Sequence, residues 1–402
     1  MSASGTISLT RNVLANWGGY VFAAGVNFVL SPFVVHSLGN SAYGIWTLLG
    51  ALVGYLGLLD LGVRAAVTRY VARFHAQQDH AEATRIVSSA LVIFGIMGLV
   101  VTLVAGGLAL FVADLFEIPA ELVSAAQIVL VLGGTSMAVS MVGGVYGGIV
   151  IGLQRFDLSN LAEIAIGVVR AVAIVVALKT GYGLVALAFI QLGVSGLSGL
   201  AGYILSRRLY PELRASPSEF SRSHLMMIFS FSGSVLLLQA SGMLILFSDS
   251  IVIGASLPIG MVTFFAIAAN LTEYARAPIS GISQTLTPSA SALEADDEDD
   301  ELKRVMLAGA RIATLIALPI ILTFMLRGHS FIGLWMGEEY AGPSGDVLWI
   351  LSLALWFAVG YQIVVATMMG ISKHNGLVPA FIIEAICNIS LSLVWIQSFG
   401  II

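Results

Sequence analysis

The sequence predicts an all-α integral membrane protein made of two repeated halves. Its mean hydropathy is +0.96, and only 10% of its 402 residues are charged, against about 25% in a soluble domain. Several apolar runs are as long as the roughly 20 residues that cross a bilayer as a helix. Residues 34–46 are weakly echoed at 250–262, and residues 152–157 at 370–375, at nearly equal offsets. The repeat indicates a duplicated bundle, a design typical of transporters.

Eleven membrane spans are expected from the lengths of the apolar runs. The spans lie near residues 12–37, 42–63, 86–113, 122–151, 158–178, 182–206, 224–255, 258–285, 305–326, 345–370 and 376–398. The first six would form an N-terminal lobe (1–206), and the last five a C-terminal lobe (224–402), joined by a polar linker (207–223). The second half lacks a twelfth span, so we expect a chain that ends one helix short of its repeat.

The charged residues between the spans predict the orientation. An N-terminus in the cytoplasm would put twelve Lys and Arg residues on that side, and only Lys179 and Arg327 on the other, as the positive-inside rule requires. Because the first half has an even number of spans, both halves begin on the same side and form parallel repeats. The twelve are Arg11, Arg69, Arg73, Arg85, Arg155, Arg207, Arg208, Arg214, Arg222, Lys303, Arg304 and Lys373.

Composition excludes several classes of site. The single cysteine, Cys387, rules out an internal disulfide, and the six histidines show no metal-ligand spacing. We therefore expect no metal and no cofactor. The net charge of −5 arises from an acidic run at residues 294–301, which is interpreted as a solvated loop. No nucleic-acid partner is expected. The loops are short and show no nucleophile–base arrangement, so an enzyme such as a membrane glycan polymerase is disfavoured.

Five short stretches resemble bacterial polysaccharide biosynthesis flippases of the multidrug/oligosaccharidyl-lipid/polysaccharide exporter superfamily. They are residues 38–44, 58–64, 68–72, 152–156 and 334–340, and they follow the family order along the whole chain. The resemblance implies two six-helix lobes around a central cavity. It also implies transport of a lipid-linked oligosaccharide, carried on polyprenyl pyrophosphate, from the inner to the outer leaflet of the bacterial inner membrane. Polysaccharide polymerase and chain-length proteins are the partners that such a role implies.

Cations inside the spans are candidates for binding the pyrophosphate, because an ionisable group in a membrane is costly and normally faces a cavity or a partner. Arg170 is the deepest of them, and the alternative is an ion pair with Glu163 on the same helical face. Arg64 and Arg276 each have an acid at ion-pair spacing, Asp60 and Glu273, so a structural pair is the alternative. Arg311, inside the ninth span, could point either way.

Two acids, Asp249 and Glu384, interrupt apolar spans without a local basic partner. They are candidates for proton or sodium coupling, as Glu273 and Asp60 also are, and the alternative is a protonated, hydrogen-bonded carboxyl. Such lone acids keep open a rival function, that of a cation-coupled multidrug exporter of the same superfamily. Small residues four apart in the fourth and sixth spans, among them Gly143, Gly147, Gly199 and Gly202, predict close helix packing. Asn16, Asn27, Asn270 and Asn388 are interpreted as interhelical hydrogen bonders.

Overall fold

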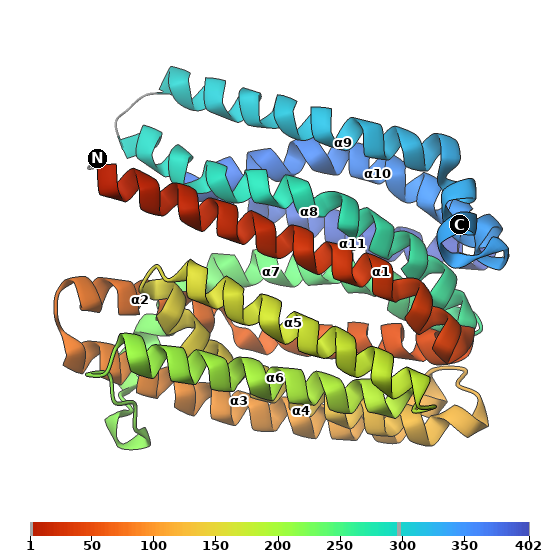
Figure 1. Ribbon diagram of the computed structural model, residues 1–402, viewed down its shortest axis with the longest axis horizontal. Helices are drawn as coiled ribbons and strands as arrows, with labels where there is room; N and C mark the ends of the chain where they lie inside the picture. The colour runs from red at the N-terminus through yellow and green to blue at the C-terminus, as the bar shows by residue number, and fades with distance from the viewer. Residues whose placement is uncertain (1–2, 296–298, 402) are drawn as a thin grey trace.

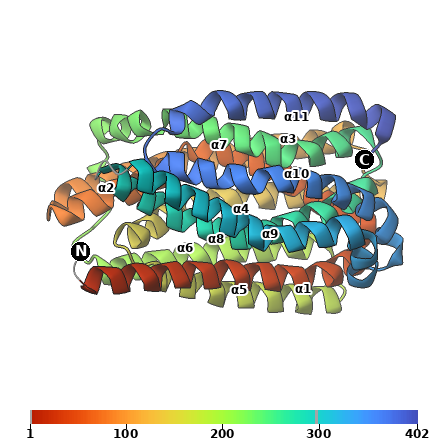
Figure 2. The ribbon, with the colours of Figure 1, turned by 90° about the horizontal axis from the view of Figure 1, so that it is seen from above.

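The computed structural model describes residues 3–295 and 299–401 as a bundle of long helices. No β-strand occurs in these two ranges, which confirms the all-α prediction. The long helices run side by side along the longest axis of the molecule (Figures 1 and 2). They are α1 (Ala3–Leu56), α2 (Val63–Ala76), α3 (His80–Leu115), α4 (Ala120–Gly152), α5 (Phe156–Lys179), α6 (Leu184–Leu209), α7 (Arg222–Ser256), α8 (Gly260–Ala295), α9 (Asp299–Met336), α10 (Glu338–Gly370) and α11 (Val378–Phe399).

Helix α1 contains the first two predicted spans, and a single residue separates them. Gly39 has φ 76° and ψ 166°, outside the helical region, and the chain turns back at this point (Figure 1). Glycine adopts a positive φ without the steric penalty of a side chain, so it suits a turn this tight. The two arms of α1 are therefore antiparallel neighbours, with no loop between them.

By length and apolar composition, nine helical segments in the described part of the chain could cross a membrane. The number of segments, nine, is lower than the eleven spans predicted from the sequence for two reasons. The segment Val21–Asp60 contains both arms of α1 and is counted once. Helix α8 falls outside the nine, because Glu273, Arg276 and many Ser and Thr residues interrupt its apolar run. The helices themselves lie where the eleven spans were predicted.

The two ends of the bundle differ in which connections they carry. One end holds the N-terminus, the α4–α5 connection and the chain between α6 and α7, and we call it the linker end (left in Figure 1). The opposite end holds the turn of α1 and the α3–α4 and α9–α10 connections, and we call it the Gly39 end. Helix α6 ends at Leu209 and α7 begins at Arg222, so the irregular chain between them lies inside the predicted linker 207–223. The lobe boundaries at 206 and 224 stay a prediction.

The outer surface of the bundle is strongly apolar. Large side chains such as Leu326, Leu334 and Phe357 are 77%, 91% and 78% exposed. Soluble monomers rarely expose apolar patches on this scale, whereas a lipid-facing surface requires them. The short 3-10 helix Gly57–Asp60 and the amphipathic helix α2 continue the second arm of α1 at the linker end. We did not predict α2 as a separate element.

Two parts of the sequence predictions lie outside the described residues. The acidic run 294–301 includes residues 296–298, and the side chain of Asn16 is also not described. On either side of the gap, Glu294 and Asp300 are exposed, and Lys303 pairs with Asp300 at 3.7 Å between Nζ and Oδ1.

The small residues of α4 and α6 bring their backbones into close contact, as predicted. A Cβ atom added to Gly143 would lie 2.7 Å from the Cα atom of Gly199, and one added to Gly202 would lie 3.2 Å from the backbone nitrogen of Gly147. These residues occupy successive turns of the two helices. The packing therefore leaves no room for a methyl group at Gly143 and little at Gly202.

We expect Gly143→Ala to destabilise the protein by about 1–3 kcal/mol, since overpacking forces the two helices apart. The check is the midpoint of thermal unfolding of the purified protein in detergent. Gly106→Ala in α3 is the matched control, because nothing lies within 4 Å of its added Cβ atom. An unchanged midpoint for Gly143→Ala would contradict this account of the α4–α6 interface.

Candidate functional site

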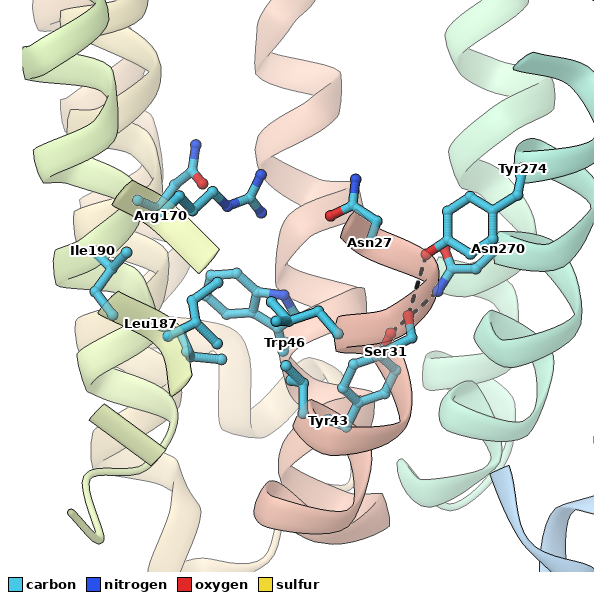
Figure 3. Close-up of a pocket in the computed structure, with 13 residues that line it drawn as sticks. Asn27, Ser31, Tyr43, Trp46, Arg170, Leu187, Ile190, Asn270 and Tyr274 are labelled. Atoms are coloured by element: carbon cyan, nitrogen blue, oxygen red, sulfur yellow. Dashed lines mark hydrogen bonds between the residues drawn. The ribbon is translucent and has the colours of Figure 1, made fainter. Parts of the chain in front are cut away.

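A polar cavity of about 290 Å³ lies between the first half of the chain and α8 (Figure 3). Both arms of α1 contribute to its wall, together with α5 and α6. Helices α1 and α8 pack along each other, as do α1 and α5, and this arrangement places the cavity inside the bundle. Its lining residues are Asn27, Leu30, Ser31, Val34, Tyr43, Trp46, Arg170, Ile174, Leu187, Ile190, Gln191, Asn270 and Tyr274.

Two hydrogen bonds join the halves at the wall of this cavity. The hydroxyl groups of Ser31 and Tyr274 lie 3.2 Å apart, and the Asn270 amide donates to the Tyr43 hydroxyl at 3.1 Å. Both pairs link α1 to α8 (Figure 3). Polar side chains in a bundle core need partners, because no water is available from the lipid. Asn270 therefore forms the interhelical bond predicted for it and also lines the cavity.

Arg170 of α5 brings a positive charge into the cavity (Figure 3). Within the described part of the chain, its guanidinium has no recorded ion pair or hydrogen bond. Glu163, the partner considered from the sequence, lines a neighbouring cavity of about 110 Å³ together with Arg170, but no ion pair joins them there. An unpaired cation inside a bundle is costly, so the arrangement favours an anionic ligand at this position.

Further cavities, with more apolar walls, lie along the first half. One of about 420 Å³ shares Tyr43, Trp46 and Gln191 with the Arg170 cavity. Another, of about 170 Å³, is lined by Arg64 and Glu163. The shared walls connect these spaces into one series, which we call the central cavities.

Arg64 reaches the central cavities from the start of α2. Its Nε atom lies 3.8 Å from Oδ2 of Asp60, and its Nη2 atom donates to the Ser140 carbonyl at 3.5 Å. The local pair predicted with Asp60 is therefore present, but it is long and leaves donors free on the guanidinium. Arg64 lines a central cavity directly, whereas Asp60 lines none of them and acts there only through its pair with Arg64.

Arg276 and Arg311 line none of the central cavities. Arg276 pairs with Glu273 at 3.2 Å between Nη1 and Oε1, as the i,i+3 spacing predicted. Its Nε atom is buried and has no partner among the described residues. Arg311 is exposed on α9. The structure thus separates these two cations from Arg170 and Arg64.

The two lone acids lie in the second half, outside the central cavities. Asp249 of α7 is half-buried and accepts a hydrogen bond of 2.8 Å from the Ser392 hydroxyl of α11. One residue earlier, Ser248 donates to the Asn388 side chain at 2.7 Å, an interhelical bond predicted for Asn388. Glu384 is exposed on α11. No group of three or more His, Cys, Asp or Glu side chains suited to a metal ion occurs in residues 3–295 and 299–401.

The Gly39 end is closed by contacts between the halves. Asn40 is at their centre: its carbonyl accepts from the Thr263 hydroxyl at 2.7 Å, and its side chain accepts from the Tyr340 hydroxyl at 2.6 Å. Nearby, the Trp335 ring stacks on Phe28, with centroids 4.7 Å apart. Asn40 thus connects the turn of α1 to α8 and α10, and Phe28 connects the first arm of α1 to α9.

The family model described as "Polysaccharide biosynthesis protein" matches residues 9–294, more than half of the sequence. The chain belongs to the polysaccharide biosynthesis protein family. This confirms the resemblance noted in the sequence.

Curated relatives and solved structures extend over nearly the whole chain. A Shigella flexneri protein whose name describes it as an O-antigen transporter is 20% identical over 98% of this chain and 93% of its own length. A Haloferax volcanii protein whose name describes it as a flippase is 23% identical, over 98% and 79%. An inward-facing multidrug resistance transporter of the MATE family superposes with a TM-score of 0.78, 19% identity, and coverage of 96% and 88%.

These relatives indicate the fold and the general role of this family member. The chain is a multi-pass membrane protein with the two-lobe fold of the MATE transporters. The names of the relatives support a flippase role in polysaccharide biosynthesis, and a transporter rather than an enzyme.

Most of the cavity wall was not predicted from the sequence. Ser31, Tyr43, Trp46, Gln191 and Tyr274 are uncharged, and nothing in their local sequence separates them from packing residues. The sequence marks them only by their position, one or two helical turns from a polar residue on the same helix face. That position indicates a cavity-lining residue only after the helices have been placed relative to one another. Arg170 was found because a charge in a long apolar run stands out.

Proposed function

We propose that the protein flips a polyprenyl-pyrophosphate-linked oligosaccharide from the inner to the outer leaflet of the bacterial inner membrane. The observation that supports it most is Arg170, a cation that forms no ion pair with the described residues and lies in a polar cavity between the two halves. A pyrophosphate offers several acceptor oxygens, and the planar guanidinium suits phosphate oxygens well. Arg64, with its long pair to Asp60, is the second cation that the headgroup would meet.

In this mechanism the headgroup enters the central cavities and the polyprenyl tail stays in lipid. The strongly apolar outer surface of the bundle is compatible with a tail that remains outside. The contacts between the halves at the Gly39 end support a state open toward the linker end. With the N-terminus in the cytoplasm, this state would receive cargo from the inner leaflet.

The rival function is that of a cation-coupled drug exporter. A cavity for cationic compounds needs acids in its wall, but the lining of the central cavities holds two arginines, Arg64 and Arg170, against one acid, Glu163. The observation disfavours cationic cargo. Overexpression should therefore give no resistance to cationic dyes, and resistance would favour the exporter.

The decisive test is the fate of the lipid-linked oligosaccharide in cells. Deletion of the gene should cause the completed lipid-linked oligosaccharide to accumulate, and the 402-residue chain supplied from a plasmid should relieve the accumulation. Extracted polyprenyl lipids, analysed by mass spectrometry, would identify the sugar. Normal lipid levels in a deletion strain that lacks any other flippase would overturn the proposal. Polymerase and chain-length proteins are the partners to look for in the same strain.

Asp249 is the group we propose for ion coupling. It is held by Ser392 on the neighbouring helix, and it lies apart from the cargo cavity, so an ion or proton can bind there while cargo is present. Glu384 is exposed, and no comparable hydrogen bond to it is recorded among the described residues. Coupling would then pass between the sites through movement of the helices, with a free energy of about 1–3 kcal/mol, as is typical of linked sites.

We expect Asp249→Asn to lower gradient-driven flipping about tenfold, because an amide neither releases a proton nor attracts a cation. The measurement is headgroup translocation in liposomes with an imposed sodium or proton gradient. Glu384→Gln is the matched control and should flip normally. If Asp249→Asn still responds to both gradients like the parent, the coupling role is wrong.

A further inference from the structure

A separate cavity of about 280 Å³ lies at the linker end, between α4, the end of α6 and the linker. It shares no residue with the central cavities. The cargo mechanism does not use it. Its lining residues are Tyr146, Ile149, Tyr203, Ser206, Arg207, Tyr210, Leu213, Arg214 and Ala215.

The wall of this cavity is basic. It includes Arg207 and Arg214 and no Asp or Glu. Arg207 is held in place because its Nη1 atom donates to the Leu213 carbonyl at 2.9 Å, which leaves its other N–H donors for a ligand. For Arg214, no ion pair or hydrogen bond is recorded within the part of the chain that the structure describes.

Neutral phenols complete the wall. The rings of Tyr146 and Tyr203 meet edge to face, with centroids 5.2 Å apart. Tyr210 is buried, and its hydroxyl lies 2.6 Å from Nδ1 of His80. Burial first, and then the charges of Glu212 and Asp79, raise the pKa of the Tyr210 phenol, so this group adds no negative charge at neutral pH.

The position of the cavity matches the boundary between lipid and water. Helix α6 is apolar enough to cross a membrane and ends at Leu209, directly beside the cavity. Tyrosines are enriched at this boundary, and Tyr203 is 44% exposed. The carbonyl end of a helix repels anions, so an anion here depends on both guanidinium groups to outweigh it.

We propose that this cavity binds the phosphate group of an anionic membrane lipid. Two arginines without carboxylate partners in the wall supply charge-assisted donors for phosphate oxygens, and basic pockets between helices at a membrane surface are suited to lipid headgroups. The bound phosphate would bridge α6 to the linker through Arg207 and Arg214. This is a site for a resident lipid, distinct from the cargo, and it does not depend on which molecule is flipped.

The test measures lipid binding to the full chain in detergent by native mass spectrometry, with phosphatidylglycerol as the probe and phosphatidylcholine as the neutral comparison. We expect R207Q and R214Q each to weaken phosphatidylglycerol binding about tenfold, the typical effect of losing one hydrogen bond to a charged group. R208Q is the matched control, since Arg208 is an exposed neighbour on α6 outside the cavity. R214Q should also fold like the parent, because no hydrogen bond or ion pair of Arg214 within the described residues would be lost. A loss of lipid binding in R214Q is therefore not explained by misfolding.

A second arm distinguishes the source of the phosphate. The thermal unfolding midpoint is measured with added inorganic phosphate and, separately, with phosphatidylglycerol. A rise with phosphatidylglycerol alone, lost in R214Q, supports the lipid site. A rise with inorganic phosphate alone would overturn the lipid assignment in favour of a soluble phosphate compound. Equal phosphatidylglycerol binding by the parent, R207Q and R214Q, or an equal loss in R208Q, would overturn the site.

Discussion

Arg170→Ala is expected to slow headgroup flipping by about one to two orders of magnitude. The guanidinium faces a polar cavity and forms no ion pair within residues 3–295 and 299–401, so the charge is available to the ligand. A hydrogen bond to a charged group contributes about 1.5–3 kcal/mol. Arg170→Lys should keep part of the activity, because lysine retains the charge but loses the planar pair of donors. The measurement is translocation of a labelled pyrophosphate lipid in liposomes.

The control for Arg170 is Arg311→Ala, which removes an exposed charge on α9 that lines none of the central cavities. It should flip at the parental rate. Arg276→Ala tests the other cation singled out in the sequence, and its effect should be small, since Arg276 pairs with Glu273. Normal flipping by well-folded Arg170→Ala would remove the main support for the pyrophosphate mechanism.

The second large effect is expected from Gly44→Ala, which should prevent closure of the Gly39 end. A Cβ atom at Gly44 would collide with the backbone carbonyl oxygen of Ile259, which lies just before α8. A backbone atom cannot rotate away as a side chain can. The two halves must therefore separate here, and flipping should fall about tenfold or more, as overpacking of 1–3 kcal/mol implies.

Spin labels would report the opening. In a Cys387→Ser background, which contains no other cysteine, labels at Ser37→Cys and Ser256→Cys probe the distance between the halves, and both positions are exposed. Gly44→Ala should shift the distances to longer values. Gly50→Ala, in the same arm of α1 with nothing within 4 Å of its added Cβ atom, should leave them unchanged. Identical distributions in both variants would mean that the Gly39 end is not held closed by this contact.

The helices could be predicted from the sequence because lipid imposes one simple rule. Backbone groups must be satisfied within each segment, so long apolar runs become helices. The break between the first two spans, at residues 38–41, and the small-residue faces of α4 and α6 were equally visible. Helix α2 was missed because its 14 residues are too short and too polar to register as a membrane span. Helix α8 shows that a helix that lines a cavity can have a composition that weakens its apolar signal.

The only part of the site that the sequence pointed to was a charged residue within an apolar run. Arg170 stood out, but the sequence could not separate it from Arg276 and Arg311, since each interrupts an apolar segment. The separation depends on which helix face meets the cavity, and that is fixed by packing between helices far apart in the sequence. Asn270 and Tyr43, for example, are joined across the two halves, a contact that no local pattern encodes.

Which half of the chain contributes the cavity wall determines how the cargo specificity of such a protein can change in evolution. Of the thirteen residues that line the 290 Å³ cavity, all but Asn270 and Tyr274 come from the first half of the chain, whereas Asp249 and Ser392 belong to the second. Under the proposed mechanism, a lineage could adapt to a new surface sugar through substitutions in the first half alone. The second half, which contributes little to the cavity wall, could then keep its sequence and provide the same ion coupling for different cargoes.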